Sequence, residues 1–258
     1  MIHNLDPVLI DLGLLQIRWY SLADIFGIIV GWVYGKSIIK KRILNESQNQ
    51  YLKNFDDLLG YIIIGIIIGG RLGYVIFYDP KLFLNNMPEI FKLWKGGMSF
   101  HGGFIGVVLA IYIFSYYKKI NYKIYFDTIC CVAPIGIFFG RIANFINGEL
   151  YGVPTNKPWG IIFPEVDNLT RHPSQIYEAF LEGILLFLIL NIFIRTSIYI
   201  KGKVASLFLI LYSIFRLISE LYREPDHQVG YVLDFLSMGS ILSFFMIALG
   251  LIMYIKVR

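Results

Sequence analysis

Seven long apolar stretches dominate this sequence, and each is long enough to cross a membrane as a helix. A spanning helix needs about 20 mostly apolar residues, because each residue advances it by about 1.5 Å. Hydrophobic residues make up 57% of the chain and charged residues only 16%, whereas about a quarter of a soluble domain is charged. We therefore expect an all-α, polytopic integral membrane protein whose single helical domain covers residues 1–258. The expected spans are 17–35, 56–78, 98–117, 126–146, 174–195, 204–222 and 235–255.

Basic residues between these stretches predict the orientation. Lys and Arg gather in short cytoplasmic loops, and here they follow the first, third, fifth and seventh spans. The N-terminus is therefore expected to be periplasmic and the C-terminus cytoplasmic. Residues 147–173 then form the longest outer connection, a short periplasmic cap. The net charge of +5 does not indicate nucleic-acid binding, because the basic residues lie in separate loops.

Charged side chains inside the expected spans are the most informative feature, since each costs at least about 2.5 kcal/mol in a membrane. In the deduced orientation nearly all lie in the outer half of the bundle, with Asp127 alone at the inner end. Independent charges would instead extend to both interfaces. We expect a polar cavity near the outer face, lined by arginines that bind an anionic headgroup. The residues at this depth are Tyr20, Asp24, Arg71, His101, Arg141, Asn144, Asn147, Glu149, Arg171, His172, Glu178, Glu182, Arg216, Glu220 and Arg223.

Two interpretations stay open for several of these residues. Arg216 and Glu220 are four apart on one helical face, so they either neutralise each other or serve a ligand. Arg141 and Asn144 also share a face, and here a ligand role is favoured. His101 is either a packing residue or a proton acceptor near neutral pH.

Tyr20 is equally typical of the aromatic belt at a membrane interface. Arg71 and Asp24 fit helix packing better than chemistry. A metal site is not expected, because the histidines are far apart in sequence and lack paired ligand spacing. Glycines surround Arg71 and His101; they either allow helices to approach closely or let backbone N–H groups reach a ligand.

The run from Gly140 to Gly152 resembles the signature of the prolipoprotein diacylglyceryl transferase family. Further similar segments follow the family order, so the resemblance covers essentially the whole chain. The segment between Gly152 and Arg171 is shorter than in members with a larger periplasmic head. The other matching segments are Arg18–Tyr20, Gly69–Tyr74, Met98–Gly103, Arg171–Glu178 and Phe215–Asp226.

This resemblance implies a transferase of the bacterial cytoplasmic (inner) membrane. Such enzymes move the diacylglyceryl group of phosphatidylglycerol to the thiol of the lipobox cysteine in a prolipoprotein signal peptide, and they release glycerol phosphate. The implied partners are these two substrates and the lipid bilayer, with no cofactor, metal or nucleic acid. By motif, the catalytic residues are His101, Arg216, Tyr20 and Glu220, and the lipid-binding residues are Arg141, Asn144, Glu149 and Gly152, with Arg71, Asp24 and Arg223 in supporting roles.

Two other functional classes fit the charge pattern less well. A transporter for an anionic metabolite would have its site near the bilayer midplane, between related repeats. Here the charges gather near the outer face, and the sequence has no evident internal repeat. A membrane hydrolase would need a recognisable nucleophile pair or metal-ligand set, which the sequence lacks.

Overall fold

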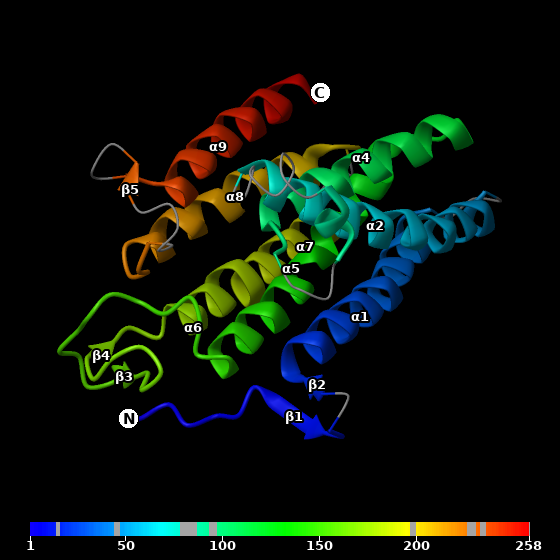
Figure 1. Cartoon of the computed structure of the whole chain (residues 1–258). Coiled ribbons are helices and arrows are strands. Elements are labelled where there is room, and N and C mark those ends of the chain that lie inside the picture. The colour runs from blue at the N-terminus through cyan, green and yellow to red at the C-terminus, as the bar shows by residue number, and fades with distance from the viewer. Residues whose placement is uncertain are drawn as a thin grey trace. The chain divides into compact units, whose positions relative to one another are not determined.

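The computed structural model is predominantly helical (Figure 1) and describes residues 1–13, 16–43, 47–77, 87–92, 97–196, 200–225, 231–232 and 236–257. The helices are α1 (Trp19–Arg42), α2 (Gln48–Phe77), the 3-10 helix η1 (Met87–Phe91), α4 (Phe100–Lys118), α5 (Tyr122–Ile146), α6 (Ser174–Glu178), the π-helix η3 (Ala179–Leu185), α7 (Leu186–Thr196), α8 (Lys203–Glu220) and α9 (Met238–Lys256).

Each expected span corresponds to a helical segment, with α6, η3 and α7 together forming the fifth. Among the described residues, five segments are long and apolar enough to cross a membrane. The expectation of an all-α membrane protein is therefore confirmed. The helices α4 and α8, of 19 and 18 residues, lie at the third and sixth expected spans. The five segments are Trp19–Arg42, Gln48–Ile76, Tyr122–Ile146, Ser174–Arg195 and Met238–Lys256.

Two features of the backbone were not expected from the sequence. The helix α2 begins at Gln48, eight residues before the expected span. Its first turns are polar and were not counted in a span defined by apolar residues. Short antiparallel strand pairs also occur, too short to show an alternating hydrophobic pattern. They are β1 (Val8–Asp11) with β2 (Gln16–Arg18), β3 (Ile161–Ile162) with β4 (Thr170–Arg171), and β5 (Tyr231–Val232) with β6 (Leu236–Ser237).

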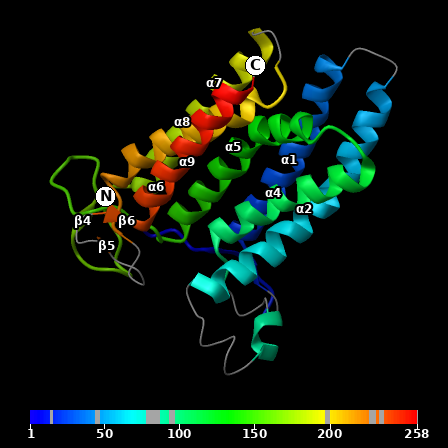
Figure 2. The ribbon, with the colours of Figure 1, turned by 90° about the horizontal axis from the view of Figure 1, so that it is seen from above.

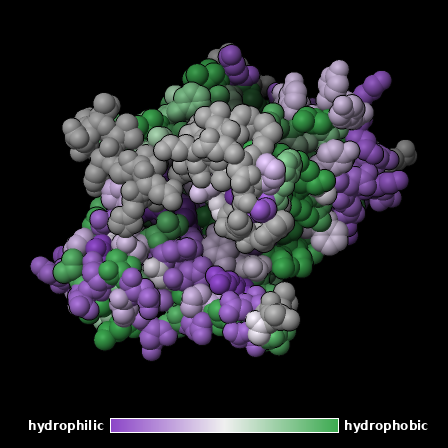
Figure 3. Space-filling model, viewed as in Figure 1, coloured by the Kyte–Doolittle hydropathy of each residue, from purple (hydrophilic) through white to green (hydrophobic). Residues whose placement is uncertain are grey.

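Exposed apolar side chains cover the helices, as a chain surrounded by lipid requires. Many large hydrophobic residues on α1, α2 and α9 are more than one-third exposed. Figure 3 shows one face of the molecule, on which hydrophilic residues gather around the β3–β4 segment. Examples of the exposed apolar residues are Ile25, Phe26, Ile29 and Val33 on α1, Ile64 and Ile68 on α2, and Phe244, Phe245, Ile252 and Ile255 on α9.

The chain forms two compact units, and each is described by itself. One consists of residues 1–35 and 127–258, and the other of residues 36–126. In the first unit α8 packs against α9 and also against α7 (Figure 2). The second unit is built around the contact between α2 and α4.

Glycines make the close contact between α2 and α4. Gly65 and Gly69 on α2 face Gly102 and Gly106 on α4, and a Cβ added at any of them would collide with backbone of the opposite helix. Small residues at this spacing let two membrane helices approach closely. The structure thus supports the packing interpretation for these glycines.

We expect Gly69→Ala to destabilise the protein. The added Cβ would collide with the carbonyl oxygen of Gly102 and lie 2.9 Å from Gly106 Cα. Forcing the helices apart should cost about 1–3 kcal/mol, measured as a lower Tm in detergent. Gly103→Ala is the matched control, because its Cβ would meet its nearest neighbour only at 3.8 Å. Equal Tm values for the two variants would contradict this packing account.

Asp127 joins two helices of the first unit at their ends. Its side chain is fully buried on α5, and its carboxylate accepts hydrogen bonds from the backbone N–H groups of Gly202, at 2.6 Å, and Ala205, at 2.8 Å. Because the first N–H groups of a helix lack intrahelical partners, an acidic side chain there stabilises it. The isolated inner charge in the sequence is therefore a cap for α8, whose own N-cap residue is Gly202.

Candidate functional site

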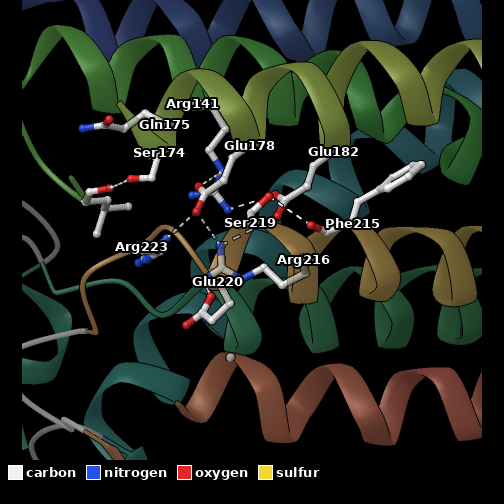
Figure 4. A network of polar contacts seen from close by, with 12 residues as sticks. Arg141, Ser174, Gln175, Glu178, Glu182, Phe215, Arg216, Ser219, Glu220 and Arg223 are labelled. Carbon is white, nitrogen blue, oxygen red and sulfur yellow. Dashed lines mark hydrogen bonds and ion pairs between the residues drawn. The ribbon is translucent and has the colours of Figure 1, made fainter. Parts of the chain in front are cut away.

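Three arginines and three glutamates from separate segments meet in the first unit (Figure 4). We call them the arginine–glutamate cluster. The helix α5 supplies one arginine, α6 and η3 supply two glutamates, and α8 with the turn after it supplies the rest. The members are Arg141, Glu178, Glu182, Arg216, Glu220 and Arg223.

Glu178 lies at the centre of this cluster. Its Oε2 is 2.9 Å from Nε of Arg141. Its Oε1 accepts hydrogen bonds from Nη1 of Arg216, at 2.8 Å, and from Nη1 of Arg223, at 3.2 Å. One carboxylate thus contacts three guanidinium groups, and charge-assisted contacts of this kind are stronger than neutral hydrogen bonds.

The other two glutamates each hold an arginine in a second direction. Arg141 donates from Nη2 to Glu182 Oε2 at 3.2 Å. Arg216 pairs through Nη2 with Glu220 Oε2 at 2.7 Å, and its Nη1 lies 3.7 Å from Glu182 Oε1. The guanidinium group of Arg141 is therefore held by two carboxylates and that of Arg216 by three, which fixes the plane of each.

The cluster has a closed side and an open side. The side chains of Glu178 and Glu182 are 0% exposed, whereas those of Arg141 and Arg216 are 14% and 12% exposed. A guanidinium has five N–H donors, and among the described residues Nη1 of Arg141 has no hydrogen-bond partner. The buried carboxylates thus hold two partly exposed arginines, and Nη1 of Arg141 is left to donate to an anion.

The helix α6, which carries Glu178, is fixed to the segment that follows α5. Ser174 Oγ donates to the carbonyl of Leu150 at 2.9 Å, and Gln175 Nε2 donates to that of Glu149 at 2.7 Å. The π-helix η3 follows directly and includes Glu182. Such π-helical turns are rare and occur frequently at functional sites.

Residues 140–152, which carry the family-like signature, place further polar groups near the cluster. Asn144 is buried and donates from Nδ2 to Glu149 Oε1 at 2.8 Å. The phenol of Tyr20, at the start of α1, lies beside Asn144 and within electrostatic range of Asp24 and Arg141. The structure therefore brings these five residues to one region of the first unit.

Gly152 contributes to the cap through its backbone. It forms a β-bridge with Arg223, and its N–H donates to the carbonyl of His172 at 2.9 Å. A Cβ here would collide with the carbonyl of Tyr222. Only glycine permits this approach, which brings Arg223 beside the signature segment.

Arg171 organises the cap, residues 147–173. Its Nη1 donates to the carbonyl of Gly152 and to Glu224 Oε2, both at 3.0 Å, and its Nη2 donates to Asp167 Oδ2 at 2.6 Å. The guanidinium carbon also lies 4.9 Å from the centre of the Tyr151 ring. Hydrogen bonds from Arg171 hold the pKa of the Asp167 carboxyl below its usual value.

Two of the expected site residues belong to the second unit. Arg71 is buried and donates to the carbonyls of Ile90, at 2.7 Å, and Gly97, at 3.0 Å. His101 lies in the first turn of α4, directly after the phenylalanine that begins the helix. The N-cap residue Ser99 accepts a hydrogen bond from the backbone N–H of Gly102. Arg71 thus holds the connection that precedes α4.

The whole sequence is similar to one known family. A family model described as "prolipoprotein diacylglyceryl transferase" matches residues 7–256. The chain belongs to the prolipoprotein diacylglyceryl transferase family. It is therefore a transferase by family.

Similar proteins from Rickettsia species bear the name phosphatidylglycerol–prolipoprotein diacylglyceryl transferase. The protein from Rickettsia bellii (strain OSU 85-389) is 49% identical over 255 residues, which is 98% of this chain and 95% of that protein. The one from Rickettsia felis is 48% identical over 249 residues, covering 96% and 95%. The one from Rickettsia typhi is 48% identical over 252 residues, covering 97% and 96%.

In this transferase, the residues that contact Arg141 are not its neighbours in the signature segment. Asn144 and Glu149, which share the signature segment with Arg141, pair with each other, and the buried carboxylates of Glu178 and Glu182 hold that arginine. The sequence did contain a signal: two glutamates four residues apart in an apolar span, at the depth of the arginines. The pairing of Arg216 with Glu220, which the sequence left open, is present.

We expect Arg171→Ala to loosen the cap. The variant loses the contacts to Gly152, Asp167 and Glu224, so local opening becomes easier. Proteolytic cleavage between residues 153 and 169 should accelerate by about tenfold, the equivalent of one or two hydrogen bonds. The exposed Lys157→Ala is the control.

The same assay gives a pH dependence. Folding lowers the pKa of Asp167, so its contribution is fully present above its ordinary value of about 3.9 and is lost as the pH falls through the lowered value. Cap protection should thus be constant from neutral pH to about pH 4 and decrease below it. Equal cleavage rates for Arg171→Ala and wild type would contradict the role of Arg171.

Proposed function

We propose that this chain transfers the sn-1,2-diacylglyceryl group of phosphatidylglycerol to the thiol of a lipobox cysteine in a prolipoprotein. The sulfur attacks the carbon of the diacylglyceryl group that is bonded to the phosphate oxygen. A C–S bond forms, the bond between this carbon and the phosphate oxygen breaks, and glycerol phosphate leaves. The thiol proton passes to a base. Membership of the family supports this reaction, and the paired arginines with open donors are the structural observation that fits it best.

The proposed setting is the inner membrane of a bacterium. Seven spans with the N-terminus periplasmic and the C-terminus cytoplasmic would place residues 147–173 outside. The arginine–glutamate cluster would then lie just below the periplasmic surface, where a secreted signal peptide and a lipid headgroup both arrive. The basic loops after alternate spans support this orientation.

Arg141 and Arg216 are proposed to bind the phosphate of the lipid. Negative charge accumulates on the leaving phosphate, and preorganised guanidinium groups in a site of low dielectric stabilise it strongly. Both arginines are partly exposed, while Glu178 and Glu182, the two carboxylates that they share, are buried. Glu220 and Arg223 are assigned to holding this arrangement, because each contacts another member of the cluster.

The remaining polar residues are proposed to position the substrates. Tyr20, Asn144 and Glu149 lie together near Arg141 and would contact the glycerol hydroxyls of the headgroup. Gly152 maintains the backbone beside them. Asp24 and Arg71 are assigned supporting roles.

His101 is proposed as the base that accepts the thiol proton. A free thiol is mostly protonated at neutral pH, and a neutral imidazole is able to take its proton in that range. The position of His101 at the start of a helix, after a capped turn, gives it a fixed backbone from which to act.

Substituting lysine for either arginine tests the phosphate assignment. Lysine keeps the charge but cannot contact a buried carboxylate and a phosphate with separate N–H groups. We expect Arg141→Lys and Arg216→Lys each to reduce kcat about a hundredfold, measured by thioether formation with phosphatidylglycerol and a lipobox peptide in proteoliposomes. Arg195→Lys is the control; Arg195 lies on α7 and donates to the Tyr34 hydroxyl. Wild-type kcat in both cluster variants would exclude this assignment.

The pH profile tests the base. We expect kcat/KM of the wild type to fall below about pH 6.5, where a histidine becomes protonated. In His101→Gln this fall should disappear, and the maximal rate should drop by about a hundredfold or more. His172→Gln, in the cap, should keep the wild-type profile. An unchanged profile in His101→Gln would assign proton removal to another group.

A further inference from the structure

Glu178 lies in a segment that resembles the family, but it is not among the residues expected to be catalytic or lipid-binding. We infer that Glu178 is the positioning residue of the transferase: it holds Arg141, Arg216 and Arg223 in the arrangement that stabilises the departing phosphate. The inference rests on the proposed function, because it concerns the same reaction. Figure 4 shows its carboxylate pointing to all three guanidinium groups.

The two carboxylate oxygens of Glu178 contact arginines from different helices, which fixes the orientation of the carboxylate. Oε2 faces Arg141 on α5 at 2.9 Å, whereas Oε1 takes both Arg216 on α8, at 2.8 Å, and Arg223 after it, at 3.2 Å. The carboxylate is planar and accepts at about four lone-pair sites. The two arginines proposed to bind phosphate are therefore set relative to each other by one rigid group.

Burial separates this role from direct catalysis. Glu178 is 0% exposed, behind arginines that are partly exposed, so a substrate on the open side meets the guanidinium groups and not the carboxylate. Without its charge, only Glu182 would contact both Arg141 and Arg216, and their mutual repulsion in a medium of low dielectric would be less well balanced. They would then be free to turn away from the phosphate.

The helix carrying Glu178 is itself fixed to the signature segment. Ser174 and Gln175 hydrogen-bond the carbonyls of Leu150 and Glu149, and Glu178 follows Ser174 by four residues, hence on the same face. The helix α6 thus sets both the arginines and the segment that carries Asn144 and Glu149. This coupling distinguishes Glu178 from Glu182, whose ion pairs within the described part of the chain are with Arg141 and Arg216.

The charge of Glu178 also predicts an unusual kinetic signature. Glu178→Gln keeps the size of the side chain but removes one negative charge behind the arginines. An anionic lipid should then bind as well as before or better, while the loosened arginines stabilise the transition state less. Misplacing such groups by about 1 Å costs roughly a hundredfold in rate. We expect kcat to fall by that factor, with the KM for phosphatidylglycerol unchanged or lower.

The experiment compares Glu178→Gln with wild type and with Asn191→Ala in proteoliposomes, using only monodisperse protein that shows a cooperative melt. Asn191 is buried thirteen residues further along the same helical segment, where it bonds Tyr34 and the carbonyl of Cys131. Its variant should lower Tm and leave kcat per folded enzyme within about threefold of wild type, as expected for a site more than 10 Å away. Binding is measured separately as the Ki of a nonreactive phosphatidylglycerol analogue with a carbon in place of the ester oxygen.

The outcomes are separable. Wild-type kcat in folded Glu178→Gln, or a Ki that rises in parallel with the loss of kcat, overturns the positioning role. If Glu178→Gln does not fold, Glu178→Asp is used in its place. This variant keeps the negative charge but has a side chain shorter by one methylene, so kcat should fall while the Ki of the analogue stays the same. A wild-type kcat in Glu178→Asp would overturn the inference. Absence of thioether product with the wild-type protein overturns the proposed reaction itself, and the positioning role with it.

Discussion

The arrangement of the first unit depends on one buried carboxylate shared by three arginines. In an apolar medium an unpaired charge is costly, and removing one partner of a buried ion pair typically costs about 3–5 kcal/mol. Glu178 therefore constrains α5, α6 and α8 together, because each must deliver its charged side chain to the same point. The cap adds to this constraint, since Gly152 bridges to Arg223 and Arg171 binds Gly152. The same contacts that stabilise the helix packing thus fix the groups proposed to bind phosphate.

Much of this fold follows from the long apolar stretches of the sequence and from the positions of the charged residues within them. Apolar stretches of about 20 residues predict helices because lipid leaves no other partner for the backbone. The helices α5 and α9 begin and end within four residues of the expected bounds, whereas α1 continues to Arg42, beyond its expected end at residue 35. The convergence of charges at one depth predicted that Arg141 and Arg216 would lie near one another, and they share Glu178 and Glu182. For the glycines around Arg71 and His101 the sequence left close helix contact as one of two interpretations, and the approach of Gly69 to Gly102 and Gly106 supports it.

Other features depend on contacts between distant segments, which a single sequence does not encode locally. Asn144 and Glu149 share a motif with Arg141, yet the partners of that arginine come from a helix about 40 residues further on. The hairpin β3–β4 has two residues in each strand, too few for a period to appear. The role of Asp127 becomes clear only when α8 begins beside it. The proximity of Arg141 and Arg216 was therefore predictable, whereas their carboxylate partners were not.

The order of charges along the chain has a consequence for biosynthesis. Arg141 emerges from the ribosome first, the glutamates of α6 and η3 follow, and Arg216 and Arg223 come last. Each newly made cation therefore finds carboxylates already present or arriving in the next helix. The helix α8 has three charged residues among its eighteen, and its entry into lipid is favoured by the glutamates that precede it. If the helices insert in the order of synthesis, the charges of the cluster are neutralised stepwise. Arg141 is paired when the glutamates of the next segment arrive, and Arg216 enters after those glutamates.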